Sequence, residues 1–307
     1  MPPWRSGPPP PQREQRLDSL RRLDDSVGSG DVYDAARAEL RLITATLKSA
    51  SFDEGVERRL FGAAAEASRS AGWTAYDSGK TAAAERHYST ALRAAASADD
   101  PVVGANTLAF WAIQHYSTGN PRGAVDLIEA ALSQAPRTGS ARLTSMLHAR
   151  ACRAHAHAGD TRAADRSANA ALDAYENAGP IEDDLPRVYW YNLGETHQLL
   201  GSSALNLGNP KRALAHFLEA STATSQEVYN AAAFPRGHSI YLARLAEAHL
   251  SLGDVDAAVA TAHDAVDRMG GVTSARGTHT LEDLRKKLAR RRGIPAVADF
   301  LDYTGIE

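Results

Sequence analysis

The residues best placed to bind a metal ion are His148, Cys152 and His155, which are spaced at i, i+4 and i+7. In a helix, this spacing would bring all three side chains to one face. Imidazole and thiolate are preferred ligands of Zn²⁺, so the three could form part of a zinc site. No fourth ligand is evident in the sequence, however, and Cys152 occupies a position that small residues fill elsewhere in the chain. We therefore favour core packing and expect neither a metal nor a cofactor.

Two other segments could carry chemistry. Gly79-Lys80-Thr81 resembles the end of a phosphate-binding loop, but that motif needs a glycine where Thr74 stands, so a helix turn is the preferred interpretation. Glu182-Asp183-Asp184 precedes Leu185-Pro186 and indicates a helix cap rather than a pair of catalytic carboxylates. The sequence contains no G-x-S-x-G, H-E-x-x-H or G-x-G-x-x-G motif. We expect no catalytic residues and no enzyme activity.

A basic cluster near the end of the sequence could contact phosphate: Arg285, Lys286, Lys287, Arg290, Arg291 and Arg292. We expect a helix over 281–291, in which three leucines at helical spacing provide an apolar stripe, and cations also stabilise the last turn of a helix. A solvated helix end is the preferred interpretation, and nucleic-acid binding is a distant alternative. The net charge of −3, from 34 basic and 37 acidic residues, gives no overall attraction to nucleic acid or to an anionic membrane.

The elements that must position these residues are helices that end at five glycines: Gly79, Gly119, Gly159, Gly208 and Gly253. The intervals between these glycines are 40, 40, 49 and 45 residues. One alanine follows each glycine by five residues and a second follows it by twelve. This register predicts antiparallel helix pairs, in which glycine takes the left-handed position after one helix and a polar residue caps the next. The two wider intervals predict longer loops at 180–186 and 228–237.

Small residues precede each of these glycines by seven positions, at Gly72, Ala112, Cys152, Gly201 and Ala246. Together with the alanines they would let paired helices approach closely, and larger side chains such as Tyr88, Ile128 and Phe217 would fill the space between repeats. The pattern resembles the tetratricopeptide repeat. The resemblance implies an all-α fold, an α-solenoid of about five to six helical hairpins with capping helices at both ends.

The domain organisation follows from this pattern. We expect a disordered proline-rich N-terminus at 1–12, N-terminal capping helices at 13–55, the repeat array at 56–269 and C-terminal capping helices at 270–307. Cys152 is the single cysteine, so the chain cannot form an internal disulfide. No apolar run of about 18 residues is present to span a membrane. We therefore expect a cytoplasmic protein that does not enter membranes.

Three stretches are also similar to the repeat region of actinobacterial Xre-type helix-turn-helix transcriptional regulators: 71–79, 242–254, and 274–276 with 281–291. In that family a DNA-binding domain precedes the repeats, whereas residues 1–30 are too few and too rich in proline to form one. Either the domain was lost, or the gene starts further upstream, or a partner carries it. The resemblance implies transcriptional or signalling control in which this chain contacts DNA only indirectly.

In tetratricopeptide arrays, the first helix of each pair lines a concave groove. Transferring that register to this chain gives the candidate ligand-binding residues Arg69, Trp73, Tyr76, Asn106, Tyr116, Arg153, Gln198 and Asn206. Amides can bind the backbone of an extended peptide, aromatic rings can anchor it, and arginine can bind a carboxylate. For Trp73 and Tyr76, packing against a neighbouring helix is an equal alternative.

These observations lead us to expect a regulatory tetratricopeptide-repeat protein that binds a peptide, a small-molecule effector or a protein partner in its groove. Solenoids suit this role because a ligand that spans several repeats can favour one arrangement of them. The alternative is a constitutive scaffold for protein assembly that has no switching ligand. The sequence leaves the oligomeric state open, including a homodimer.

Overall fold

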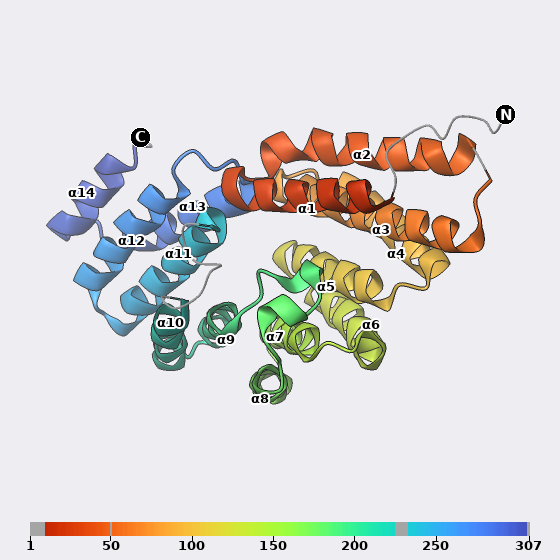
Figure 1. Cartoon of the computed structure of the whole chain (residues 1–307). Coiled ribbons are helices and arrows are strands. Elements are labelled where there is room, and N and C mark those ends of the chain that lie inside the picture. Colours follow the sequence, from red (N-terminus) through yellow and green to blue (C-terminus); the bar gives the residue numbers. More distant parts are fainter. Residues whose placement is uncertain (1–9, 50, 225–232, 306–307) are drawn as a thin grey trace. The chain divides into compact units, whose positions relative to one another are not determined.

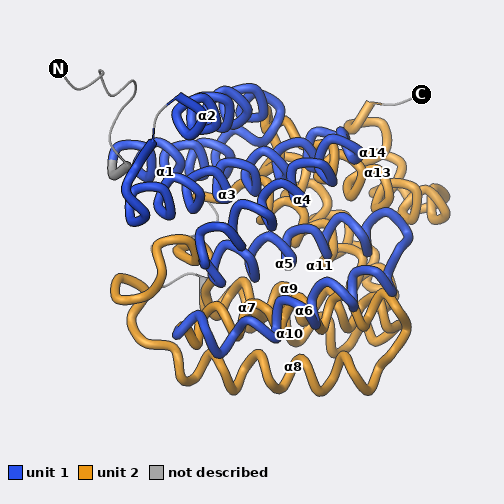
Figure 2. Tube along the Cα trace, turned by 90° about the vertical axis from the view of Figure 1, so that its right-hand side faces the viewer, with its two compact units in different colours: residues 1–139 blue, residues 140–307 orange. Residues whose placement is uncertain are grey.

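The computed structural model describes residues 10–49, 51–224 and 233–305. The chain divides into two compact units, Met1–Gly139 and Ser140–Glu307, which Figure 2 colours separately. Among the described residues the regular elements are fourteen α-helices and two short 3₁₀ turns. The helices form successive antiparallel hairpins, and this confirms the predicted all-α fold of tetratricopeptide-like pairs.

Unit 1 consists of two N-terminal helices followed by two hairpins (Figure 1). Helix α3 pairs with α4 and α5 pairs with α6, while α1 and α2 both pack against α3. The bounds are α1 (Pro10–Val27), α2 (Ser29–Ser49), α3 (Glu54–Asp77), α4 (Thr81–Ala98), α5 (Pro101–Ser117) and α6 (Pro121–Thr138). Helix α1 therefore begins inside segment 1–12, for which the proline content predicts disorder; residues 1–9 lie outside the described residues.

Unit 2 contains three hairpins and two C-terminal helices. Its hairpins are α7 with α8, α9 with α10, and α11 with α12, and α13 packs against α11. The bounds are α7 (Ala141–Ala158), α8 (Thr161–Glu176), α9 (Leu193–Asn206), α10 (Pro210–Thr224), α11 (Pro235–Leu252), α12 (Val255–Met269), α13 (Ala275–Ala289) and α14 (Pro295–Tyr303). The helix expected at 281–291 begins six residues earlier than predicted, because the Ser274 hydroxyl accepts a hydrogen bond from the Gly277 N–H and caps it.

The hairpin turns have the chemistry that their sequence predicts. At Gly159, φ is +77°, a left-handed conformation that glycine adopts without strain. The next residue, Asp160, accepts a hydrogen bond from the Ala163 N–H at 2.9 Å and so caps α8. The same pair of features recurs at the glycines before α6, α10 and α12. Each of these four turns is thus specified locally by two adjacent residues, whereas at Gly79 the following Lys80 makes no capping hydrogen bond.

The repeated alanines form the contacts inside and between hairpins. All ten are at most 1% exposed: Ala84, Ala91, Ala124, Ala131, Ala164, Ala171, Ala213, Ala220, Ala258 and Ala265. The larger Tyr88, Ile128 and Phe217 are also buried, as the packing pattern predicts. Of the two predicted loops, 180–186 is confirmed by two 3₁₀ turns, Ile181–Asp183 and Pro186–Val188. Most of the other, at 228–237, lies outside the described residues.

Replacing Gly72 by alanine is expected to lower the free energy of unfolding by about 1–3 kcal/mol through overpacking. A Cβ at this position would lie 2.7 Å from two ring atoms of Tyr88, which is fully buried. The matched control is Gly104→Ala in α5, where a Cβ meets nothing within 4 Å. That change should stabilise the helix by about 0.5–1 kcal/mol. Urea unfolding followed by circular dichroism measures both, and effects of the same sign would contradict this packing argument.

Candidate functional site

In unit 1 the predicted groove residues of α3 are covered by α1. The Trp73 indole N–H donates a hydrogen bond to the Asp24 carboxylate of α1 at 3.0 Å, and the Trp73 ring lies edge-on against Phe110, with centroids 4.9 Å apart. Tyr76 is buried beside Trp73. Both aromatic side chains therefore pack within the unit, in line with the packing alternative considered for them.

Arg69 belongs to a buried ionic network between α1 and α3. Its guanidinium contacts the Glu66 Oε1 at 2.7 Å, and Arg21 of α1 contacts the same oxygen at 2.7 Å. Arg21 also pairs with Asp18 at 2.9 Å, and the Arg69 guanidinium lies over the Phe110 ring. This network satisfies the charge on Arg69 inside the unit, so Arg69 has a structural contact where the sequence predicts a ligand contact.

Asn106 and Tyr116 lie on α5 and are both buried. Asn106 is 2% exposed, and its amide oxygen has no hydrogen-bond partner among the described residues. A buried acceptor without a partner costs about 1–3 kcal/mol. Among the predicted groove residues of unit 1, Asn106 is therefore the one with a buried amide oxygen that a ligand could satisfy.

Unit 2 brings two of the predicted residues together in a row of polar side chains that crosses α7, α9, α11 and α13. We call this row the polar track; its members are Arg153, His157, Asn206, Arg244, Glu247 and Lys287. Arg153 donates to the Asn206 Oδ1 at 3.2 Å, and Arg244 also donates to this oxygen. Arg244 pairs with Glu247 at 2.9 Å, and Glu247 in turn pairs with Lys287. Every contact in the row joins α7 to α9, α9 to α11 or α11 to α13, or two turns of one helix, and we call these four helices the inner helices of unit 2.

The centre of the polar track is electropositive. Two guanidinium groups converge on the Asn206 amide oxygen, which is a neutral acceptor. Beside them, Arg153 also contacts the His157 Nε2 at 3.2 Å. Burial, followed by the charges of Arg153 and Arg244, lowers the pKa of His157 to about 3, so this imidazole is neutral at pH 7. A site with this field favours an anionic group over a neutral one.

A second polar group lies on the same inner helices of unit 2. The Tyr241 hydroxyl donates to the Glu195 carboxylate at 2.5 Å, and Arg150 lies 4.0 Å from that carboxylate and over the Trp190 ring. Burial and the adjacent carboxylate raise the pKa of Tyr241 well above its usual value. The third predicted residue of unit 2, Gln198, is buried, and its amide oxygen has no partner among the described residues.

Arg244 completes the polar track but is not among the residues predicted from the sequence. It lies within stretch 242–254, which carries part of the family resemblance, but the transferred register selected only first-helix positions facing the expected groove. Its signal was the spacing of three residues to Glu247, which in a helix predicts an ion pair. Because Lys287 of the basic cluster pairs with Glu247, part of that cluster also belongs to the track.

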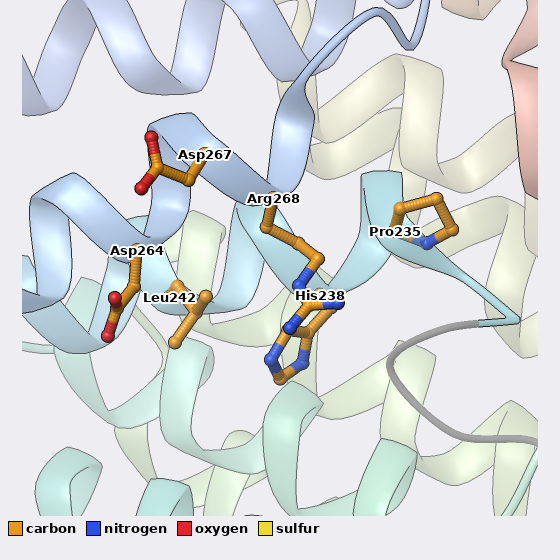
Figure 3. Close-up of a pocket in the computed structure, with 6 residues that line it drawn as sticks. All are labelled: Pro235, His238, Leu242, Asp264, Asp267 and Arg268. Atoms are coloured by element: carbon orange, nitrogen blue, oxygen red, sulfur yellow. The ribbon is translucent and has the colours of Figure 1, made fainter.

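A pocket of about 460 Å³ lies elsewhere in unit 2, between α11 and α12, and contains none of the predicted residues (Figure 3). Figure 3 shows Arg268 and His238 close together, with Asp267 next to Arg268 on α12 and Asp264 one turn earlier. Burial and the charge of Arg268 lower the pKa of His238. The lining residues are Pro235, His238, Leu242, Asp264, Asp267 and Arg268. The lining carries two carboxylates and one guanidinium, so this pocket lacks the electropositive character of the polar track.

The segments considered for metal and phosphate lie in the helices and turns of the repeats. Cys152 packs among Ala156, Ala164 and Leu200, and burial raises the pKa of its thiol. No three His, Cys, Asp or Glu side chains of the described ranges lie close enough to hold a metal as they stand. The Gly79-Lys80-Thr81 segment is a helix turn, as predicted. None of the described helices combines the length and apolarity that crossing a membrane requires.

Lowering the pH from 7 to 5 is expected to reduce the free energy of unfolding, with His157 alone contributing about 2 kcal/mol. The folded-state pKa of His157 is about 3, below the ordinary 6.5. The unfolded chain therefore takes up the proton first, and stability is lost progressively as the pH falls below 6.5. Urea unfolding at the two pH values should show a smaller loss for His157→Asn. His279→Asn, at an exposed imidazole, is the control and should leave the loss unchanged. Equal losses in all three proteins would refute the assignment to His157.

Comparison with known proteins supports the fold and goes no further. No protein-family model matches the chain, and no curated protein matches it. Among solved structures, the chain is similar to a Rap protein complexed with competence and sporulation factor. The two chains are 12% identical, with a TM-score of 0.54, and the match covers 96% of this chain and 90% of the Rap protein. It is also similar to BtubC from P. vanneervenii, with 18% identity, a TM-score of 0.50, and coverage of 83% and 90%. The chain is therefore a helical-repeat protein of tetratricopeptide-like fold.

Proposed function

We propose that this chain is a regulatory repeat protein whose unit 2 binds a peptide or small molecule bearing a carboxylate at the polar track. The observation that carries the proposal is the convergence of Arg153 and Arg244 on one neutral amide oxygen of Asn206. Two guanidiniums can bind a carboxylate through hydrogen bonds in which both donor and acceptor are charged, so that Coulomb attraction is added to what the neutral amide offers. A ligand carboxylate would thus compete well with the amide.

Binding at this position requires only a small rearrangement. Asn206 is exposed at the end of α9, so its side chain can rotate away and release both guanidiniums. Glu247 stays paired with Lys287 and Arg244, which holds Arg244 in place for the incoming anion. His157 is neutral at pH 7, and its ring offers the ligand one hydrogen-bond donor and one acceptor without any change of protonation.

A regulatory role is supported by the number of helices that meet at the site. The polar track includes residues of α7, α9, α11 and α13, so one ligand would contact successive repeats of unit 2 at once. Such a ligand stabilises the relative rotation of the repeats in which it binds most tightly. The Rap protein with the similar fold was solved in complex with competence and sporulation factor, which supports ligand binding as a use of this architecture. The proposed role includes no catalytic step.

The test is thermal unfolding of the full chain with two matched peptide libraries, one with free C-terminal carboxylates and one with the same sequences amidated. A carboxylate ligand at 100 times its Kd should add about 2.7 kcal/mol to the free energy of unfolding, and its amidated form should add much less. Arg153→Met and Arg244→Met should each abolish the stabilisation. The control is Arg162→Met, which removes an exposed guanidinium on α8, outside the track.

The competing functions give different results in the same experiment. A constitutive scaffold would show no selective stabilisation by any peptide or metabolite, and a purified protein partner would bind equally to wild type and to Arg244→Met. Nucleic-acid binding through the basic cluster would appear as salt-sensitive retention of DNA that is lost when Arg290, Arg291 and Arg292 are replaced. Stabilisation that survives both track substitutions would place the ligand elsewhere.

A further inference from the structure

Two histidines face each other inside the α9–α10 hairpin of unit 2, away from the residues of the polar track. The Nδ1 atoms of His197 on α9 and His216 on α10 are 3.1 Å apart, and the ring centroids are 5.3 Å apart. Both side chains are partly buried. The two Nδ1 atoms therefore point toward each other between the helices, one as hydrogen-bond donor and the other as acceptor.

The separation of these nitrogens is close to that of two ligands on one ion. Zinc–imidazole distances of about 2.0–2.1 Å and tetrahedral angles place two ligand nitrogens about 3.3 Å apart. A metal ion also requires both imidazoles to be unprotonated at the nitrogens that bind it. In the hydrogen bond between the two Nδ1 atoms, the acceptor nitrogen already lacks a proton, and the donor ring can move its proton to Nε2 when a metal ion binds.

A third ligand is available one turn along α10. Glu219 follows His216 by three residues, so the two lie on the same face of the helix. Its negative charge acts to raise the pKa of His197 on the facing helix. Glu219 is exposed and forms no ion pair with any described residue, so its side chain is able to rotate. The other charge near the pair, Arg212, is engaged by Asp165.

We propose that His197, His216 and a rotated Glu219 bind a divalent transition-metal ion, with water in the fourth position. Two imidazoles, one carboxylate and a water form a ligand set suited to Zn²⁺. The ion would link α9 to α10 and stabilise that hairpin. This inference goes beyond the carboxylate-binding function, since it uses none of the track residues and can stand if that function fails.

The test is calorimetric titration of Zn²⁺ into the full chain after removal of metal by dialysis, with Mg²⁺ as the comparison ion. We expect one Zn²⁺ per chain, a rise in Tm with Zn²⁺, and no effect of Mg²⁺, which prefers oxygen ligands. His197→Gln and His216→Gln should each weaken Zn²⁺ binding at least tenfold, while keeping a side chain that can hydrogen bond across the hairpin. Glu219→Gln should weaken it about tenfold.

The matched control is His148→Gln, which removes a half-buried imidazole from α7 of the same unit and should leave Zn²⁺ affinity unchanged. X-ray absorption of the loaded protein should then report two imidazole ligands, and one in either histidine variant. Zn²⁺ binding that is unaffected by the double change His197→Gln with His216→Gln would overturn the proposal. A wild-type chain that binds no Zn²⁺ would overturn it as well, and the pair would then be a hydrogen bond between neutral imidazoles.

Discussion

Replacing Glu66 by alanine is expected to lower the free energy of unfolding by about 3–5 kcal/mol, because it removes one partner of a buried ionic network. The Glu66 side chain is 3% exposed, and its Oε1 accepts from both Arg21 and Arg69 at 2.7 Å. With alanine, two guanidiniums of like charge would remain close together and poorly solvated. Because Arg21 belongs to α1, the loss should fall mainly on the packing of α1 against α3.

Urea unfolding measured by circular dichroism tests this expectation, and hydrogen exchange locates the effect. Backbone amides of α1 should exchange faster in Glu66→Ala than in wild type, whereas those of α6 should change little. The control is Glu54→Ala at the start of α3, where the carboxylate is 86% exposed and pairs with Arg58. An exposed pair of this kind contributes at most about 1 kcal/mol. If both substitutions cost the same, the buried network is not what holds α1 in place.

Replacing Arg142 by methionine should cost a similar amount, about 3–5 kcal/mol, by releasing the long loop between α8 and α9. The Arg142 side chain is 5% exposed and donates to the carbonyls of Gly179 at 2.7 Å and Tyr191 at 3.1 Å. It also lies 3.4 Å from the Asp184 carboxylate. Methionine fills much of the same space but removes the donor of both carbonyls and the cation beside the Asp184 carboxylate, which keeps its hydrogen bonds from Ser140 and the Leu185 N–H.

Limited proteolysis combined with urea unfolding separates loop opening from global loss of stability. Under native conditions, Arg142→Met should be cut within 177–192 well before wild type is cut. Arg212→Met is the matched control in unit 2, since it removes an arginine from a half-exposed pair with Asp165 and should cost under about 1 kcal/mol. A loop that resists proteolysis in Arg142→Met would show that other contacts are sufficient to hold it.

The features that the sequence predicted correctly are those encoded over a few neighbouring residues. Gly159 and Asp160 specify a turn because one conformation and one capping hydrogen bond are enough to define it. The buried alanines were predictable for a similar reason, since a small residue repeated at fixed spacing implies close helix packing. Helix α13 was predicted too short because the capping role of Ser274 was not recognised.

The candidate site was predicted only in part, because its contacts join residues distant in sequence. Trp73 donates to Asp24, 49 residues earlier, and nothing near either residue in the sequence predicts that α1 covers this face of α3. Arg153 and Arg244 meet at Asn206 across 53 and 38 residues. The transferred repeat register predicted that Arg153 and Asn206 lie on inner helices, but it could not show which side chains contact each other.

The contact between Arg150 and Trp190 gives unit 2 an intrinsic optical probe. Trp190 is the only tryptophan in the sequence from 140 to 307, and the Arg150 guanidinium lies 5.8 Å from the centroid of its ring. Indole emission responds to the charge and solvent around the ring, so fluorescence from this single residue depends on the position of Arg150. With the three other tryptophans replaced by phenylalanine, a movement of the inner helices that displaces Arg150 changes the emission maximum or the intensity of Trp190 fluorescence. No added dye is needed.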